Sequence, residues 1–271
     1  MKKLNNITML GCGSLGSALA RGMAKDPDFR AALRLFDVDT KRAAALAKET
    51  GAQLLPDLHQ APEADVVLVV VKPNDLQSAL QAASACIVPE TIVVSCAAGQ
   101  SIASIADALH AHIPGLAVLR VMPNVAAQLG LSVSAIVAGP GVDAEQRELV
   151  KKMFATVGAV HVLAKESLLH AVTALAASGP AMASLIVESF MDAGVRAGLS
   201  RAQAEAMTLQ MWRGSLALLD GADSPAALRA QVTSPAGTTA EALASLESGA
   251  LRGVIGDAIM AAVRRSGQLG I

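Results

Sequence analysis

The apolar positions of the first 163 residues fall in short runs, and stretches with helical spacing separate these runs. The runs occupy residues 7–10, 33–36, 65–71, 91–95 and 117–121. After Asp65, the third run consists only of valines and one leucine, which is typical of a parallel strand buried on both faces. Strands that alternate with helices at this rhythm predict an α/β fold with a doubly wound parallel sheet.

Two weaker runs follow the main series. We expect residues 134–137 to form an edge strand and residues 160–163 to close the sheet. A helix over residues 144–156 is predicted between them, because Asp143 and Gln146 have the spacing of a capping box at its start.

The pattern changes beyond residue 164, where strand signals vanish. Long helical stretches are predicted over residues 166–197, 201–219 and 238–268, and Gly179-Pro180 interrupts the first of them. The first and third stretches are rich in alanine and carry few charges, so we expect them to pack against a second subunit. The sequence therefore predicts two domains, 1–163 with the sheet and 164–271 as an all-α dimerisation and substrate-binding domain.

One segment of the first helical stretch has the length of a membrane span. Residues 167–187 contain no Asp, Glu, Lys or Arg. They do contain His170, Pro180 and several hydroxyl residues, and no basic cluster flanks them. We expect this segment to be a helix buried in protein and not in a membrane.

A glycine-rich turn follows the first apolar run and opens the first helix. It has the pattern G-x-G-x-x-G and consists of Gly11, Cys12, Gly13, Ser14, Leu15 and Gly16. The first glycine permits the sharp turn, the second a close approach of backbone to a pyrophosphate, and the third tight packing of the helix on the sheet. Asp37 directly follows the second run, about 20 positions after the turn. In this motif an acidic residue at that sequence separation binds the ribose hydroxyls. This combination favours a Rossmann-type dinucleotide site.

Further residues converge on the same place. Ligands of doubly wound sheets bind outside the carboxyl ends of the strands. The glycine-rich turn and Asp37 lie at such ends, and so do the turns after the third and fourth runs. Those two turns add Val70, Val71, Lys72, Pro73, Cys96, Ala97 and Ala98 as candidate cofactor contacts.

Composition excludes several other functions. The formal net charge is −1, so neither a nucleic-acid-binding surface nor attraction to an anionic membrane is expected. The three cysteines lack C-x-x-C spacing, which predicts a reduced, cytoplasmic protein without a disulfide framework. No metal site is predicted.

A second loop of small and hydroxyl residues precedes the helix that begins near Ala240. It reads Val232-Thr233-Ser234-Pro235-Ala236-Gly237-Thr238-Thr239. The free N–H groups at such a helix start favour an anion, typically a carboxylate. An ordinary Ser/Thr cap explains the same residues equally well.

The order of these motifs resembles pyrroline-5-carboxylate reductases over residues 7–268. The matching segments are G-C-G-S-L-G, V-K-P, S-C-A-A-G, M-P-N, A-S-G-P-A and V-T-S-P-A-G-T-T-x-E-A-L. The resemblance implies NAD(P)H-dependent reduction of the C=N bond of Δ1-pyrroline-5-carboxylate to proline, by a homodimer built through the C-terminal helices that can assemble into a larger ring. It also implies that residues 11–16 hold the pyrophosphate, that residues 71–73 line the ribose and nicotinamide side, and that residues 97 and 98 lie beneath the cofactor.

The resemblance assigns the substrate to the second loop. Its substrate-binding residues are Ser234, Gly237, Thr238 and Thr239. Backbone N–H groups and the Ser234 hydroxyl would hold the substrate carboxylate, and Thr239 is the implied catalytic residue, which orients the imine or helps to protonate it. Three positions depart from the family pattern and bear on substrate preference: Ala236 replaces the first glycine of the loop, so that position should tolerate a Cβ, and Met182 and Val125 replace Tyr and Thr.

The cofactor preference rests on Asp37. A carboxylate there hydrogen-bonds ribose hydroxyls and repels a 2′-phosphate, which favours NADH slightly. NADPH stays possible because Lys41 or Arg42 can reach a phosphate.

Two other functions share this pattern of domains. A β-hydroxyacid dehydrogenase would have a lysine on the first helix after the sheet, but residues 168–187 contain none. A dinucleotide-binding regulator without turnover is the non-catalytic alternative, and the intact Ser234, Gly237 and Thr239 disfavour it.

Overall fold

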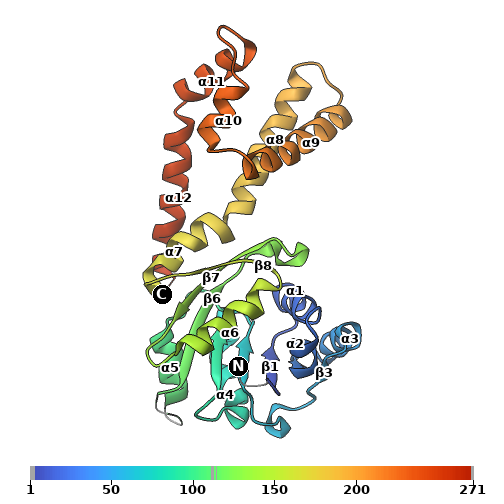
Figure 1. The fold of residues 1–271 in the computed structure, drawn as a ribbon, viewed down its shortest axis with the longest axis vertical. Coiled ribbons are helices and arrows are strands. Elements are labelled where there is room, and N and C mark those ends of the chain that lie inside the picture. The colour runs from blue at the N-terminus through green and yellow to red at the C-terminus, as the bar shows by residue number, and fades with distance from the viewer. Residues whose placement is uncertain (1–3, 111–112, 114, 270–271) are drawn as a thin grey trace. The chain divides into compact units, whose positions relative to one another are not determined.

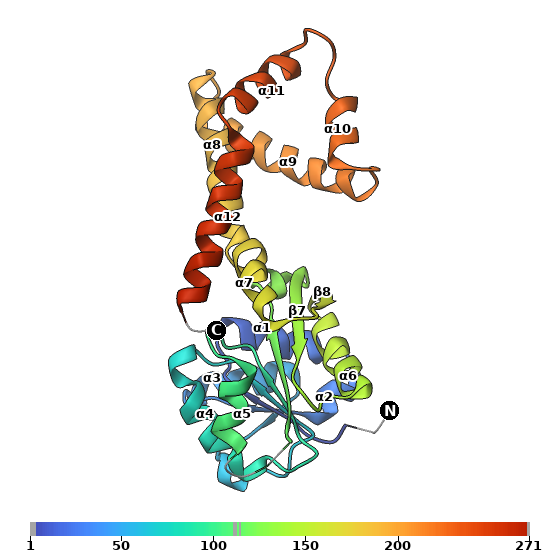
Figure 2. The same cartoon turned by 90° about the vertical axis from the view of Figure 1, so that its left-hand side faces the viewer.

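The sheet is the centre of the N-terminal part of the computed structural model, which describes residues 4–110, 113 and 115–269 (Figures 1 and 2). The strands are β1 (Ile7–Leu10), β2 (Leu33–Phe36), β3 (Gln53–Leu54), β4 (Val66–Val69), β5 (Ile92–Ser95), β6 (Ala117–Met122), β7 (Ser132–Ala138) and β8 (Gly158–Val162). They form one sheet in the order β3-β2-β1-β4-β5-β6-β7-β8. β1 to β6 run parallel, and the strand order reverses between β1 and β4, where a doubly wound sheet has its ligand crevice. The predicted α/β fold is confirmed.

The penultimate strand differs from the prediction, whereas the last strand, β8, closes the sheet as predicted for residues 160–163. The segment expected to be an edge strand, residues 134–137, lies within β7, which is internal and runs antiparallel to β6. The edge is β8, which pairs parallel with β7 after the crossover through α6 (Ala144–Ala155). The prediction of an edge was wrong, because β7 pairs with β6 on one side and with β8 on the other. The capping box of Asp143 and Gln146 at the start of α6 is confirmed.

Helices cover both faces of the sheet, and each face has its own apolar cluster. They are α1 (Ser14–Met23), α2 (Pro27–Ala32), α3 (Thr40–Thr50), α4 (Leu76–Ala83), α5 (Ile102–His110) and α6, with 3₁₀ turns η1 (Leu58–Gln60), η2 (Pro73–Asp75), η3 (Ser84–Cys86) and η4 (Val125–Leu129). The side chains of β4 alternate between the clusters, Val66 and Leu68 in the first and its other two valines in the second. Buried residues of α1, α3 and α6 belong to the first cluster, and those of α4 and α5 to the second.

The chain divides into two compact units. The first comprises Met1–Ala177 with Ala262–Ile271, and the second Ser178–Ala261. We call them the sheet unit and the helical unit. The boundary predicted after residue 163 falls just after β8, whereas compactness assigns the next fourteen residues to the sheet unit as well.

The helical stretches are more broken than predicted. The C-terminal elements are η5 (Glu166–Leu168), α7 (Leu169–Val172), a π-helical turn (Thr173–Ala177), α8 (Gly179–Arg196), α9 (Arg201–Asp220), α10 (Pro225–Gln231), α11 (Thr238–Ser248) and α12 (Leu251–Gln268). The predicted interruption at Gly179-Pro180 is confirmed, because α8 begins there. The single helix predicted over 238–268 was wrong: Ala250 has a positive φ of 53° and separates α11 from α12.

The helical unit has almost no core of its own. Among its described residues only Ala204 and Thr208, both on α9, are buried. The helical stretch Glu166–Arg196 is long and apolar enough to cross a membrane, and 6% of that apolar window is buried within the chain. Most side chains of this window are exposed or half-buried within one chain. The expected burial of residues 167–187 in protein therefore stays a prediction that depends on a second subunit.

Candidate active site

The glycine-rich turn has the geometry that its three glycines predicted. Gly11 has a φ of 100°, and a Cβ there would collide with the carbonyl oxygen of Val70. A Cβ on Gly16 would collide with the Gly11 carbonyl, so α1 can approach the turn only with glycine at this position. Nothing lies within 4 Å of the place where a Cβ of Gly13 would stand. Gly13 is the N-cap of α1 and offers no side-chain cap, so the first N–H groups of α1 stay available to an anion.

Asp37 fixes the turn from the neighbouring strand. Its side chain is buried, 8% exposed, at the end of β2. Oδ2 accepts a hydrogen bond from the Cys12 N–H at 2.6 Å, and Oδ1 accepts one from the Asp39 N–H at 2.8 Å. Arg42 lies at the same end, with Nη2 3.1 Å from Asp39 and Nη1 3.9 Å from Asp37. The carboxylate therefore holds a negative charge beside the entrance to the turn.

The other predicted cofactor contacts gather at the same edge of the sheet. The Val70 N–H donates to the Leu10 carbonyl and the Cys96 N–H to the Val69 carbonyl, which extends the ladder by one residue beyond the ends of β4 and β5. The turns after β2, β1, β4 and β5 therefore lie side by side in that order. Lys72, Pro73 and Ala98 are exposed there, and Val70 and Val71 are half-buried.

The cysteines of this edge are not reactive groups. Burial, followed by the negative charge of Asp37, raises the pKa of the Cys12 thiol to about 12. Burial likewise raises the pKa of the Cys96 thiol. Both thiols stay protonated at neutral pH, which opposes a nucleophilic or metal-binding role. In the parts of the chain that the structure describes, no group of His, Cys, Asp and Glu has the arrangement of a metal site.

The segment after β6 forms a hollow against α1, and the M-P-N motif was the one indication of a function there. The hollow, of about 180 Å³, is lined by residues of α1, of η4 and of the π-helical turn. Asn124 Nδ2 donates to the Ala176 carbonyl at 3.1 Å, and Asn124 Oδ1 accepts from the Val133 N–H at 3.3 Å. The amide of Asn124 thereby holds a carbonyl of the π-helical turn, the kind of backbone irregularity that is frequent at functional sites.

Gln128 is a second residue that the sequence analysis missed. It belongs to η4, and its Nε2 donates a 2.7 Å hydrogen bond to Ser14 Oγ at the start of α1. The two residues are 114 positions apart, so no local pattern could indicate the contact.

The second loop of small residues lies in the helical unit and forms one turn before α11. Gly237 is the N-cap, with φ −84° and ψ 169°, and it offers no side-chain cap. The Gly237 N–H donates to the Ser234 carbonyl at 3.1 Å, and a Cβ on Gly237 would collide with the Ser234 hydroxyl. The loop therefore brings Ser234, Gly237, Thr238 and Thr239 together at an open helix start. The Thr239 side chain is half-buried, and its hydroxyl makes no hydrogen bond to any described residue.

Ala236 shows how the departure from the family loop is accommodated. It has a φ of 54°, a left-handed conformation that glycine adopts without strain and alanine does not. The Cβ is tolerated, as expected, but at a conformational cost of about 1 kcal/mol.

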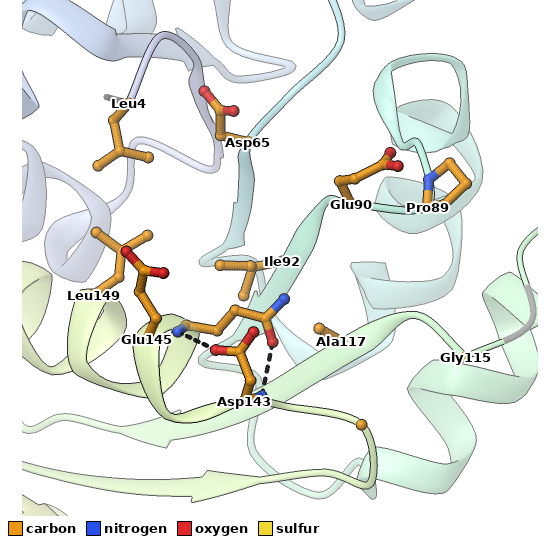
Figure 3. A pocket seen from close by; sticks show the side chains of 12 residues that line it. Leu4, Asp65, Pro89, Glu90, Ile92, Gly115, Ala117, Asp143, Glu145 and Leu149 are labelled. Carbon is orange, nitrogen blue, oxygen red and sulfur yellow. Dashed lines mark hydrogen bonds between the residues drawn. The ribbon is translucent and has the colours of Figure 1, made fainter. Parts of the chain in front are cut away.

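Another hollow lies at the opposite edge of the sheet (Figure 3). It has about 450 Å³ and is lined by Ile92 and Ala117, the first residues of β5 and β6. Acidic side chains surround it, and Asp143 and Asp65 have structural roles. Asp143 caps α6, and Asp65 accepts hydrogen bonds from the N–H groups of Asn5 and Asn6. This hollow is at the amino ends of the strands, away from the glycine-rich turn.

The residues at the carboxyl edge fit a dinucleotide. A pyrophosphate needs an unobstructed approach to backbone N–H groups, which Gly13 and the uncapped start of α1 provide. A ribose needs an acceptor beside that turn, which the Asp37 carboxylate provides.

Comparisons with known proteins agree with this assignment. A family model described as "NADP oxidoreductase coenzyme F420-dependent" matches residues 6–99. A model described as "Pyrroline-5-carboxylate reductase dimerisation" matches residues 166–269. The two matches fall on the glycine-rich turn and on the C-terminal helices, respectively.

Full-length relatives extend the likeness across both units. A pyrroline-5-carboxylate reductase of Corynebacterium melassecola is 36% identical over 272 residues, which cover 98% of this chain and 99% of that protein. The structure of such a reductase from Coxiella burnetii is 28% identical, with a TM-score of 0.92 and 99% of each chain covered. The Plasmodium falciparum enzyme, solved with NADP bound, is 26% identical, with a TM-score of 0.83 over the whole of both chains. The chain belongs to the pyrroline-5-carboxylate reductase family.

Proposed function

We propose that the chain reduces the C=N bond of Δ1-pyrroline-5-carboxylate with NAD(P)H to form L-proline, the last step of proline biosynthesis. The observation that carries this proposal is the open N-terminus of α11, framed by Ser234 and Gly237, in a chain that also presents a dinucleotide turn. An anionic substrate and a hydride source are the two reactants that such a chain must bind.

The sheet unit would hold the cofactor, which supplies the hydride when bound. The N–H groups at the start of α1 and the Ser14 hydroxyl would bind the pyrophosphate, and Asp37 the adenosine ribose. Val71, Lys72 and Pro73 would line the ribose and nicotinamide side, and Ala97 and Ala98 would lie beneath the cofactor. Val70 and Cys96 would be further cofactor contacts.

NADH is favoured over NADPH in this proposal, with NADPH accepted. The buried Asp37 carboxylate would repel a 2′-phosphate. Arg42 offers a positive charge nearby, but its closest acidic partner is Asp39, at 3.1 Å. Two carboxylates beside one guanidinium leave little net attraction for a phosphate.

The helical unit would bind the substrate carboxylate. The N–H groups of Thr238 and Thr239, at the start of α11, and the Ser234 hydroxyl are the donors. They would hold the flat ring so that its imine carbon can receive the hydride, and proximity of this kind is worth several kcal/mol. Thr239 would donate a hydrogen bond to the ring nitrogen, where the proton ends. Reduction then forms one C–H and one N–H bond from the C=N bond, one hydride and one proton.

A dimer completes this proposal. Exposed apolar side chains of the helical unit, such as Leu185 at 64% and Val254 at 60%, need a cover that the chain lacks. A second copy, joined through residues 164–271, would supply it, while residues 1–163 bind the dinucleotide. Specific activity should then fall on dilution, and a fully active monomer in light scattering would contradict the dimer. Light scattering would also detect the assembly of dimers into a ring, because it measures the mass of the particle.

The location we infer is the cytoplasm. All three cysteines are buried thiols without disulfide partners, as expected of a protein from a reducing compartment.

One experiment tests the reaction itself. Purified enzyme is mixed with pyrroline-5-carboxylate and either NADH or NADPH, and cofactor oxidation and proline formation are followed together. Equal amounts of oxidised cofactor and proline are expected. The absence of turnover with both cofactors would refute the reductase and favour a dinucleotide-binding regulator.

A further inference from the structure

Gln128 reaches the start of α1 from a distant part of the chain. Its Nε2 lies 2.7 Å from Ser14 Oγ, and both side chains are exposed, so burial does not force them together. Ala127, the preceding residue of η4, is 3% exposed and anchors this turn against α1. Gly130, with a φ of 73°, ends η4 directly after Leu129. The backbone that carries Gln128 is therefore packed, and the hydrogen bond to Ser14 places its amide.

The direction of this hydrogen bond determines what the serine can do. A hydroxyl group carries one hydrogen and two acceptor lone pairs. Because Ser14 Oγ accepts from Gln128, its own hydrogen remains available to another acceptor. It makes no second hydrogen bond to any residue that the structure describes. A hydroxyl that already accepts one hydrogen bond is also a stronger donor, since hydrogen bonds in a chain polarise one another.

The available hydrogen lies where an anion is favoured. Ser14 is the first residue of α1, next to the uncapped N–H groups and the open approach at Gly13. Without Gln128, the Ser14 hydroxyl could rotate and donate to a nearby carbonyl, as Ser17 Oγ does to the Cys12 carbonyl at 2.9 Å.

We propose that Gln128 is a positioning residue for the cofactor pyrophosphate, acting through Ser14: the amide holds the serine hydroxyl as an acceptor, so that its hydrogen points to a phosphate oxygen. This inference rests on the proposed cofactor site. It assigns to η4 a role that neither the glycine-rich pattern nor Asp37 indicates.

The test is a double-mutant cycle with ADP-ribose, which carries the pyrophosphate but no nicotinamide. The dissociation constant is measured by calorimetry for wild type, Gln128→Met, Ser14→Ala and the double variant. In Gln128→Met the dissociation constant for ADP-ribose should rise about three- to tenfold, because the charge-assisted hydrogen bond from Ser14 to the pyrophosphate is lost. If Gln128 acts through Ser14, the same substitution should have no further effect in the Ser14→Ala background.

Further readouts separate this role from a structural one. Gln128→Met should raise the KM for NADH and leave kcat at saturating cofactor and the unfolding midpoint unchanged. Gln81→Met, an exposed glutamine on α4, is the matched control and should bind ADP-ribose as wild type does.

Two outcomes would overturn the role of Gln128 and leave the cofactor site intact. One is unchanged ADP-ribose binding in Gln128→Met, and the other is an equal loss of affinity from this substitution with and without the Ser14 hydroxyl. Wild-type enzyme that fails to bind ADP-ribose would instead remove the proposed cofactor site, and the role of Gln128 with it.

Discussion

The backbone N–H of Cys12 donates a 2.6 Å hydrogen bond to Oδ2 of Asp37, so the glycine-rich turn and the end of β2 share one buried carboxylate. The other oxygen of this carboxylate accepts from the Asp39 N–H. Two backbone N–H groups therefore hold the Asp37 carboxylate in place. Its charge is fixed at the ribose end of the proposed cofactor site.

Replacing this carboxylate should change the choice of cofactor. Asp37→Ser removes the repulsion of a 2′-phosphate and leaves Arg42 to attract it. We expect the ratio of kcat/KM for NADPH to that for NADH to rise about tenfold or more, because one pair of like charges a few ångströms apart near a protein surface contributes about 1.4 kcal/mol or more. The ratio does not depend on the fraction of active enzyme, so partial misfolding does not disturb it.

Asp39→Ser is the matched control for this variant. It removes a neighbouring exposed carboxylate but keeps a residue that caps α3. Its ratio should move less than that of Asp37→Ser. An unchanged ratio in Asp37→Ser would remove Asp37 from the account of cofactor preference.

The hydroxyl of Thr239 should matter for the chemical step. Thr239→Ala deletes the group proposed to donate to the ring nitrogen, so kcat should fall at least about tenfold. Thr239→Ser keeps a hydroxyl on the same helical turn and should restore most of the rate. Steady-state kinetics at saturating substrate and cofactor measure both. Equal kcat values in wild type and Thr239→Ala would refute the role of this residue.

The sequence predicted the parts of the site that depend on local pattern. Three features can be recognised within a few residues each: the glycine spacing, the acidic end of the second run and the valine run after Asp65. The strand order of the sheet brings these features to one edge. Two contacts of the sheet unit could not be predicted from the sequence. Gln128 meets Ser14 across 114 positions, and Arg120 meets Glu166 across 46. Such contacts depend on how elements that are distant in sequence pack together, and the local pattern of apolar residues does not indicate this.

The helical unit was harder to predict for a related reason. Its helices carry apolar residues without a strict helical period. Within one chain most of these side chains are exposed, so their pattern does not indicate a core of the unit. The break at Ala250 was missed since alanine usually favours a helix, yet here it follows Gly249, the C-cap of α11, in a left-handed conformation.

The strained loop residue offers a stabilising substitution. Ala236 has a φ of 54°, which glycine adopts without the Cβ clash. Ala236→Gly should therefore stabilise the loop by up to about 1 kcal/mol and raise the unfolding midpoint by a few degrees. Ala240→Gly, inside α11, is the opposite control and should destabilise by about 1 kcal/mol. A lower midpoint for Ala236→Gly would show that the loop does not keep this conformation in solution.

An ion pair near the junction of the sheet unit with α7 should make the unit sensitive to the loss of one partner only. Arg120 on β6 is 1% exposed, and its Nη1 donates to Glu166 Oε1 at 2.7 Å. The same oxygen accepts from the Ile102 N–H at 2.8 Å, whereas Nε and Nη2 of Arg120 have no hydrogen-bond partner among the described residues. One carboxylate therefore balances a charge that water cannot reach.

Removing only the carboxylate should be costly. Glu166→Leu leaves the Arg120 guanidinium buried without a counter-charge, and we expect a loss of about 3 kcal/mol in the free energy of unfolding. Urea unfolding at one fixed protein concentration measures it, since a dimer's stability depends on concentration. The double variant Arg120→Met with Glu166→Leu should regain a large part of this loss, because it removes the unpaired charge as well. Glu49→Gln, in the half-exposed pair with Arg21, should leave the midpoint close to that of wild type. If the double variant is no more stable than Glu166→Leu alone, the loss comes from packing at position 166 and not from the buried charge.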